Sequence, residues 1–129
     1  MAGEQTDKTT GDVQQRTLLV VDDDPVMLQN LEIIFGSIFD EVFTACNPLE
    51  AEAVLRVHPI SHLICDYELG EGVLPGTLLI AGWRRSYPKL RKTVLFTATL
   101  RTSIEVPPEV DTLMSKRAPV ETLIAELKD

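Results

Sequence analysis

The stretch Leu-Leu-Val-Val-Asp-Asp-Asp at residues 18–24 decides the fold of this chain. Four apolar residues without a polar break are typical of a strand that is buried on both faces, as in a parallel sheet. Three carboxylates follow directly, so we expect them at the carboxyl end of that strand, where open α/β sheets bind their ligands. Adjacent acids at the rim of an apolar core repel one another and are costly to desolvate.

The three acids differ in what they can do for the fold. Asp24 precedes Pro25 and fits the N-cap of a helix that has proline at its first position. Asp22 and Asp23 have no such structural use. Two interpretations stay open for them: a solvated acidic turn, or a site in which a bound cation offsets the repulsion. An all-oxygen site of this kind would suit Mg²⁺.

The composition excludes several classes of protein. The chain has 129 residues, enough for one domain with a real core, and its 44% hydrophobic and 25% charged residues are ordinary for a globular protein. The net charge of -8 repels nucleic acid and anionic membranes, so we predict neither as a partner. Cys46 and Cys65 follow apolar runs and are predicted to be reduced core residues, because a disulfide would suit a small secreted scaffold better. Their spacing fits no metal motif.

The first residues differ in character from the rest. Residues 1–16 are mostly polar and are predicted to form a disordered tail ahead of a domain at 17–129. The tail has no apolar core of a secretory signal, and no apolar run approaches the roughly 20 residues of a membrane span. These features predict a cytoplasmic location.

Strand-like and helix-like segments alternate along the chain. We predict strands at 17–21, 41–45, 62–65, 93–96 and around 113–114, and helices at 25–38, 48–57, 78–87 and 119–128, with a glycine-rich loop at 68–76. This alternation predicts a parallel sheet with right-handed crossovers. Pro107 and Pro108 fall between the fourth and fifth strands, so a helix there must be short or replaced by a loop.

A polar functional group follows most of the predicted strands. The residues are Asp22 and Asp23, Asp66, Thr97 and Lys116, and a parallel sheet would gather them at one edge. Mg²⁺ held by acids can neutralise phosphoryl oxygens, and an aspartate beside it can attack phosphorus. A hydroxyl and an ammonium can bind the remaining phosphoryl oxygens. Each residue also has an ordinary role open to it, as a loop, cap or surface residue.

Four short motifs together resemble the receiver domain of bacterial two-component response regulators. They are Val-Val-Asp-Asp-Asp at 20–24, Ile-Cys-Asp at 64–66, Leu-Phe-Thr-Ala at 95–98 and Met-Ser-Lys at 114–116. The resemblance covers residues 17–129. It implies a flavodoxin-like, doubly wound α/β fold with a five-stranded parallel sheet in the order 2-1-3-4-5.

The resemblance also implies a role for each site residue. Asp66 would be the phosphoacceptor, served by a histidine kinase or phosphotransfer protein. Asp23, Asp66 and the backbone carbonyl of Glu68 would bind Mg²⁺ directly, with Asp22 acting through water. Thr97 and Lys116 would bind the phosphoryl group. Such a module switches a protein-interaction surface and is not an enzyme with a separate substrate.

The chain departs from the receiver pattern near its end. Receivers usually carry proline directly after the lysine, but Lys116 is followed by Arg117 and Ala118. An aromatic residue commonly lies three positions before the lysine, where this chain has Leu113. With Pro107 and Pro108 before it, this predicts an altered signalling surface, built around a shortened or irregular fourth helix, whereas the residues of the site chemistry are intact.

Two other functions stay open at this stage. One is a pseudo-receiver that serves as an interaction scaffold without phosphoryl turnover. The other is a haloacid-dehalogenase-type phosphatase, whose Asp-x-Asp motif the sequence at 22–26 meets loosely. The chain fits either a stand-alone receiver or part of a longer regulator or hybrid kinase.

Some residues outside these motifs have an open interpretation. The basic residues at positions 84–92 suit a solvated loop at the edge of the sheet away from the acids, with a partner-binding patch as the alternative. His58 and His62 are predicted to have surface or turn roles, and the pattern does not decide whether Trp83 is buried.

Overall fold

The computed structural model describes residues 15–98 and 104–128, and the predicted tail at 1–14 lies outside the described residues. The element bounds are β1 (Thr17–Val21), α2 (Pro25–Phe35), β2 (Glu41–Ala45), α3 (Pro48–Val57), β3 (His62–Asp66), α4 (Gly76–Ser86), β4 (Lys92–Thr97), β5 (Thr112–Ser115) and α5 (Val120–Glu126). Among the described residues, no helix is long and apolar enough to cross a membrane.

The five strands form one parallel sheet in the order β2-β1-β3-β4-β5, which confirms the predicted fold. The register pairs Val21 with Cys65, Asp66 with Phe96, and Thr97 with Ser115. The carboxyl ends of β1, β3, β4 and β5 therefore lie level with one another. Side chains that follow these strands meet at one edge of the sheet.

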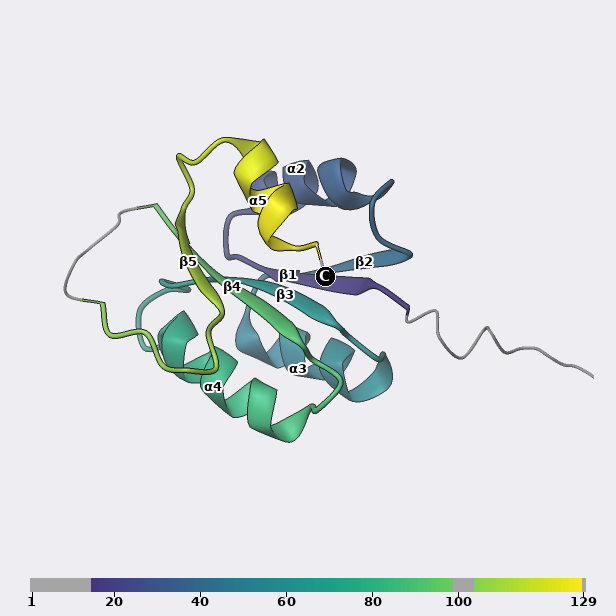
Figure 1. Cartoon of the computed structure of the whole chain (residues 1–129). Coiled ribbons are helices and arrows are strands. Elements are labelled where there is room, and N and C mark those ends of the chain that lie inside the picture. The colour runs from purple at the N-terminus through teal and green to yellow at the C-terminus, as the bar shows by residue number, and fades with distance from the viewer. Residues whose placement is uncertain (1–14, 99–103, 129) are drawn as a thin grey trace, which may run out of the picture.

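Helices cover both faces of the sheet, α2 and α5 on one side and α3 and α4 on the other (Figure 1). Alternate residues of β1 point to opposite faces, so Leu18 and Val20 pack with α2 and α5, whereas Leu19 and Val21 pack with α3 and α4. Both sets are fully buried. This explains why the strand reads as a continuous apolar run.

The predicted caps begin the first two helices. The Asp24 side chain accepts a hydrogen bond from the backbone N–H of Val26, and the Asn47 side chain accepts one from that of Glu50. Proline follows each cap and has no N–H that would need a partner. These two local signals therefore place α2 and α3 correctly on the sequence.

Several helix ends differ from the prediction. Helix α2 ends at Phe35, three residues earlier than predicted, yet Phe39 continues the apolar pattern because a tight turn folds it back onto the core. Helix α4 begins at Gly76, two residues earlier than predicted, and α5 is shorter at both ends. Periodicity reports which residues face the core, and it does not report where the helical hydrogen bonds stop.

The connection from β4 to β5 has no helix in its described part, residues 104–111, which agrees with the predicted loss or shortening of a fourth helix; residues 99–103 lie outside the described part. Ile104 and Val110 pack onto the core. Arg84 of α4 forms an ion pair of 2.7 Å with Asp111, and Arg85 forms one of 3.1 Å with Glu109. The end of this connection is thus anchored to α4.

Three predictions about single residues were wrong or undecided. Cys65 is buried as predicted, but Cys46 is exposed, because it follows the edge strand β2. His62 is fully buried rather than at a surface turn; its Nδ1 lies 2.6 Å from the Ser61 hydroxyl, and its ring meets Phe39 edge-on. Trp83 is buried.

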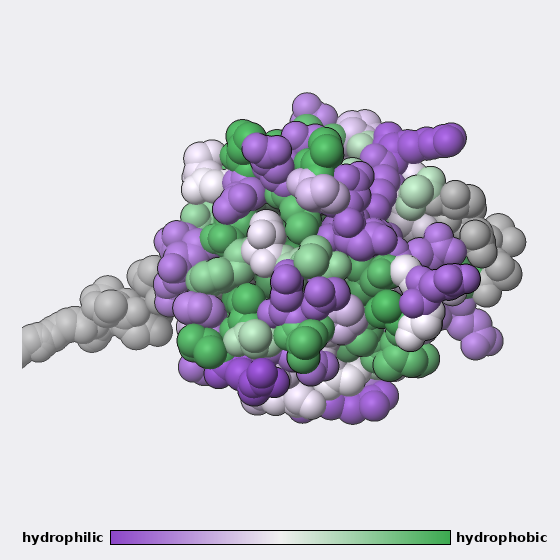
Figure 2. Space-filling model, turned by 180° about the vertical axis from the view of Figure 1, so that it is seen from behind, coloured by the Kyte–Doolittle hydropathy of each residue, from purple (hydrophilic) through white to green (hydrophobic). Residues whose placement is uncertain are grey.

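The surface carries a mixed pattern. Figure 2 shows hydrophobic residues interspersed with hydrophilic ones over one face of the molecule.

Candidate functional site

Three carboxylates converge where β1 and β3 end. Asp22 follows the last residue of β1, and Asp66 is the last residue of the neighbouring strand β3. Asp23 adds a third acid, and one donor oxygen from each of the three lies within 4.8 Å of the others. Asp22 and Asp66 are almost completely buried, at 2% and 6% exposure, whereas Asp23 is exposed. The predicted acidic cluster thus forms, open to solvent on the Asp23 side.

Lys116 extends to this cluster from the end of β5, the edge strand two places from β3. Its Nζ lies 2.7 Å from Asp22 Oδ2 and 3.2 Å from Asp66 Oδ2. The lysine follows β5, and its backbone N–H donates to the carbonyl of Thr97 at 2.7 Å, which fixes its starting point beside β4. Arg117 in place of the usual proline therefore does not move the lysine away from the acids.

Backbone donors orient the two buried carboxylates. The N–H of Asp24 donates to Asp22 Oδ1 at 2.9 Å, and the N–H of Glu68 donates to Asp66 Oδ1 at 3.4 Å. In each carboxylate one oxygen is held by the chain that follows the strand, and the other is directed to Lys116. The loops after β1 and β3 thus set the direction of both acids.

The electrostatics of the cluster are dominated by burial. Burial and the nearby Asp22 carboxylate raise the pKa of Asp66 to about 6, against the opposing effect of the Lys116 ammonium. Burial lowers the pKa of Lys116, but its bonds to Asp22 and Asp66 outweigh that effect, so the net shift is upward. The lysine stays protonated. Two buried carboxylates share one ammonium, and an additional cation would relieve the remaining repulsion.

The other two predicted site residues lie next to the cluster. Thr97 is buried at the end of β4, the strand that adjoins β3. Glu68 is exposed, and its backbone adjoins Asp66 through the hydrogen bond described above. The structure therefore brings all the predicted residues to one edge of the sheet. The binding roles of the Thr97 hydroxyl and the Glu68 carbonyl stay predictions.

An open groove of about 610 Å³ leads to the cluster. Asp23 lies on one side, and the loop after β3 supplies Tyr67, Glu68 and Glu71 on the other. The loop turns through Gly70 and Gly72, whose φ angles of 121° and 75° belong to the left-handed region that glycine adopts without strain. This gives a small charged molecule access to the cluster at Asp23.

This chain resembles known proteins in its three-dimensional structure and not detectably in its sequence. The sequence matches no family model, and no curated protein matches it significantly. Several solved structures match well. A response regulator of Burkholderia pseudomallei is 23% identical with a TM-score of 0.75, over 88% of this chain and 67% of that one. A receiver domain protein of Methanospirillum hungatei JF-1 is 19% identical with a TM-score of 0.74, over 88% and 91%.

The third comparison is with the signal receiver domain of an HD domain-containing protein from Pseudomonas fluorescens Pf-5. It is 21% identical with a TM-score of 0.77, over 88% of this chain and 92% of that one. The chain has the fold of a response regulator receiver domain. Within this receiver fold, the cluster occupies the carboxyl ends of the first and third strands, where the strand order reverses and α/β sheets bind ligands.

The donor set of this receiver fold suits a hard divalent cation. All three side chains offer carboxylate oxygens, which Mg²⁺ and Ca²⁺ prefer, and none offers nitrogen or sulfur. Because Asp23 is exposed, a cation held here would keep access to water, as Mg²⁺ usually requires.

One residue of the site was not anticipated from the sequence. A Cβ at Gly76 would lie 2.3 Å from the carbonyl oxygen of Asp66 and 2.8 Å from a Leu95 methyl group. Only glycine lets the start of α4 approach β3 this closely. The available signal was a glycine directly after Pro75 and before the apolar run of α4.

Proposed function

We propose that Asp66 accepts a phosphoryl group from a histidine kinase or phosphotransfer protein and that this modification switches a protein-interaction surface. The convergence of Asp22, Asp23, Asp66 and Lys116 at the end of β3 carries the proposal. The Burkholderia pseudomallei relative, described with a phosphorylated aspartic acid and a calcium ion, supports it.

In the proposed transfer, a carboxylate oxygen of Asp66 attacks phosphorus. The new O–P bond replaces the P–N bond to the donor histidine, whose imidazole leaves. With a pKa of about 6, Asp66 is mostly ionised at neutral pH and competent as a nucleophile. The Lys116 ammonium, 3.2 Å from Asp66, is placed to neutralise charge on the transferred group.

The metal in this proposal is Mg²⁺, which Asp23, Asp66 and the backbone carbonyl of Glu68 would bind directly, with Asp22 acting through water. When bound, it supplies positive charge to the phosphoryl oxygens. The chain's own residues do the rest: Asp23 offers its carboxylate at the solvent-exposed side of the cluster, and Lys116 holds Asp22 in place from the buried side. The domain catalyses only its own phosphorylation and dephosphorylation, and it has no separate substrate.

The proposed switch passes through Thr97 and Lys116. A phosphoryl group beside them adds negative charge and acceptor oxygens, which favours a hydroxyl and an ammonium hydrogen bond to it. The Lys116 N–H is bonded to the Thr97 carbonyl, so the two residues move together. Leu113 offers no aromatic ring to follow them, so we propose that the signal leaves through residues 104–108. Residues 109–111 are held by Arg84 and Arg85.

A second candidate is an interaction scaffold without phosphoryl turnover. The absence of an aromatic residue at Leu113 and of a helix in the described β4–β5 connection favours it.

Amide hydrogen exchange with Mg²⁺, in the presence and absence of beryllofluoride as a phosphoryl mimic, tests the proposed function. We expect changed protection at residues 66–68 and 104–108, with little change in α5. No change at either segment would favour the scaffold. A larger response in α5 than in 104–108 would contradict the proposed route. Steady hydrolysis of phosphomonoesters would identify a phosphatase instead.

A further inference from the structure

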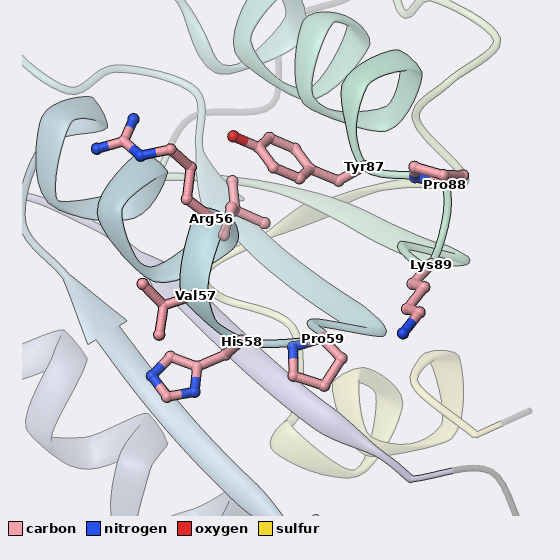
Figure 3. A pocket seen from close by; sticks show the side chains of 8 residues that line it. Arg56, Val57, His58, Pro59, Tyr87, Pro88 and Lys89 are labelled. Atoms are coloured by element: carbon pink, nitrogen blue, oxygen red, sulfur yellow. The ribbon is translucent and has the colours of Figure 1, made fainter.

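A groove lies at the amino end of the sheet, opposite the carboxylate cluster. Two adjoining cavities of about 400 and 420 Å³ share Pro59, Pro88 and Lys89 in their walls. One wall is the segment from the end of α3 into β3, and the other is the segment from the end of α4 into β4 (Figure 3). We call it the amino-edge groove and define it by residues 55–61 and 87–91.

The charge of this groove is opposite to that of the whole chain. The sequence has 20 acidic and 12 basic side chains. Among the described residues that line the groove, none is acidic, whereas Arg56, Lys89 and Arg91 are cationic. The groove at the carboxylate cluster shows the reverse, with Asp23, Glu68 and Glu71. The amino-edge groove therefore carries a local positive charge within an acidic chain.

Stabilisation of cations at the carboxyl ends of helices accounts for only part of the positive charge of the groove. Arg56 lies in the last turn of α3, where a cation is stabilised by the helix dipole. Lys89 and Arg91 lie beyond Ser86, the last residue of α4, so the dipole does not explain them. Nearby, Arg84 and Arg85 bond to acids of the β4–β5 connection, and they do not line this groove.

The groove also offers an apolar surface between its cations. Val57, the last residue of α3, is apolar and yet 73% exposed. Figure 3 shows the Tyr87 ring extending from the end of α4 on the side of the cavity that faces Arg56. His58 stacks on Phe43, with ring centroids 4.1 Å apart, which fixes the wall beside Val57. A cationic rim around an apolar patch suits a ligand that has both carboxylates and apolar side chains.

From this charge complementarity, we infer that the amino-edge groove docks an acidic peptide segment of a partner protein, with an apolar side chain over Val57 and carboxylates at Arg56 and Lys89. The whole length of β3 separates the groove from Asp66, since His62 begins that strand and Asp66 ends it. The docking is therefore independent of the phosphorylation state. It would tether the partner while the other edge of the sheet switches.

The test is a titration of the full chain with a synthetic peptide of two central leucines flanked by glutamates, followed by backbone NMR. We expect saturable shifts within residues 55–61 and 87–91 that weaken as salt is raised. Lys89→Glu and Arg56→Glu should each weaken binding by about fivefold or more. The matched control Arg117→Glu makes the same change in net charge at an exposed site at the opposite edge of the sheet and should stay within about twofold.

Three further comparisons decide the proposal. The same peptide with glutamines in place of glutamates should bind at least about fivefold more weakly, and addition of Mg²⁺ and beryllofluoride should leave the affinity within about twofold. Equal binding of the glutamine peptide, shifts centred elsewhere, or tighter binding of a single-stranded oligonucleotide would overturn it. Thermal unfolding of each variant confirms that a lost affinity does not reflect a lost fold. Failure of Asp66 to accept phosphate would leave this result untouched.

Discussion

The carboxylate cluster and the described part of the β4–β5 connection are built in different ways. Asp22 and Asp66 take their positions from buried parallel strands whose register leaves them little freedom. The described part of the connection has no helix, and its end is held by side chains of α4 through Arg84 and Arg85. The chemistry of the site thus depends on the sheet. The end of the connection depends on a few individual contacts.

The site should tolerate nearby substitutions better than the β4–β5 connection does. A residue directly after a core strand is positioned by the whole sheet, so its placement tolerates substitutions in nearby loops, as Arg117 after Lys116 illustrates. A surface held by a few ion pairs can be altered by one substitution. Five predictions test or refine this contrast, from the largest expected effect to the smallest, with the phosphoacceptor itself tested last.

Gly76→Ala should give the largest loss of stability. Its Cβ would overlap the Asp66 carbonyl and a Leu95 methyl, which costs about 3 kcal/mol of unfolding free energy. Gly82→Ala is the matched control in the same helix, with nothing within 4 Å of the new Cβ, and should stabilise by roughly 0.5–1 kcal/mol. Urea unfolding measures both. Equal effects of the two substitutions would refute the tight contact between α4 and β3.

Arg84→Ala should loosen the β4–β5 connection. The Arg84 guanidinium donates to the Asp111 carboxylate and to the carbonyls of Glu109 and Arg91, so its loss should cost about 1–2 kcal/mol. Arg84→Lys keeps the charge but not the planar fork and should recover only part of this. Amide exchange at 109–111 should rise in both variants. Unchanged exchange there would show that the ion pairs do not hold the segment.

Asp23→Asn should weaken Mg²⁺ binding by about tenfold, since it removes one charged ligand from the cluster. Asp24→Asn is the control: it removes a charge from the neighbouring position, and asparagine keeps the N-cap that Asp24 gives to Val26. Its effect should stay within about threefold. NMR titration with Mg²⁺ compares the two. Equal weakening would mean that bulk charge, rather than a defined site, attracts the ion.

Asp66→Asn should stabilise the metal-free protein at neutral pH by about 1 kcal/mol, because it removes one of two buried, mutually repelling carboxylates. The folded-state pKa of Asp66, about 6, lies above its ordinary value of 3.8. The favourable contribution of protonated Asp66 is therefore complete below pH about 4 and is lost as the pH rises through about 6. Unfolding in a chelator should show the variant's advantage growing over this range. An advantage independent of pH would contradict the assigned pKa.

The sequence was sufficient to predict the parallel sheet and the position of the acids at its edge, for a physical reason. Runs such as residues 18–21 are apolar because both faces of the strand are covered, and Asp22 and Asp66 mark where the runs of β1 and β3 meet the edge of the sheet. The strands at Thr17–Val21 and Glu41–Ala45 therefore agree with their predicted bounds. Asp66, Thr97 and Lys116 needed no further information to be placed together.

Features that depend on distant contacts could not be predicted. Arg84 meets Asp111 across 27 positions, and nothing local in the basic run distinguishes it from Lys89. His62 is buried because Ser61 and Phe39 accommodate its ring, and Cys46 is exposed because β2 is an edge strand. The sequence predicts Gly76 in a loop, whereas it begins α4 and permits a close approach between two elements, which no periodicity records.

The most direct test of the central claim is the intact mass of the protein after incubation with acetyl phosphate and Mg²⁺. The wild-type chain should gain one phosphate, and so should the control Glu121→Gln, which changes an exposed acid on α5. Asp66→Asn, nearly isosteric but without a nucleophilic carboxylate, should gain none. Undiminished phosphate on Asp66→Asn, or none on the wild-type chain, would contradict the assignment of Asp66 as the phosphoacceptor.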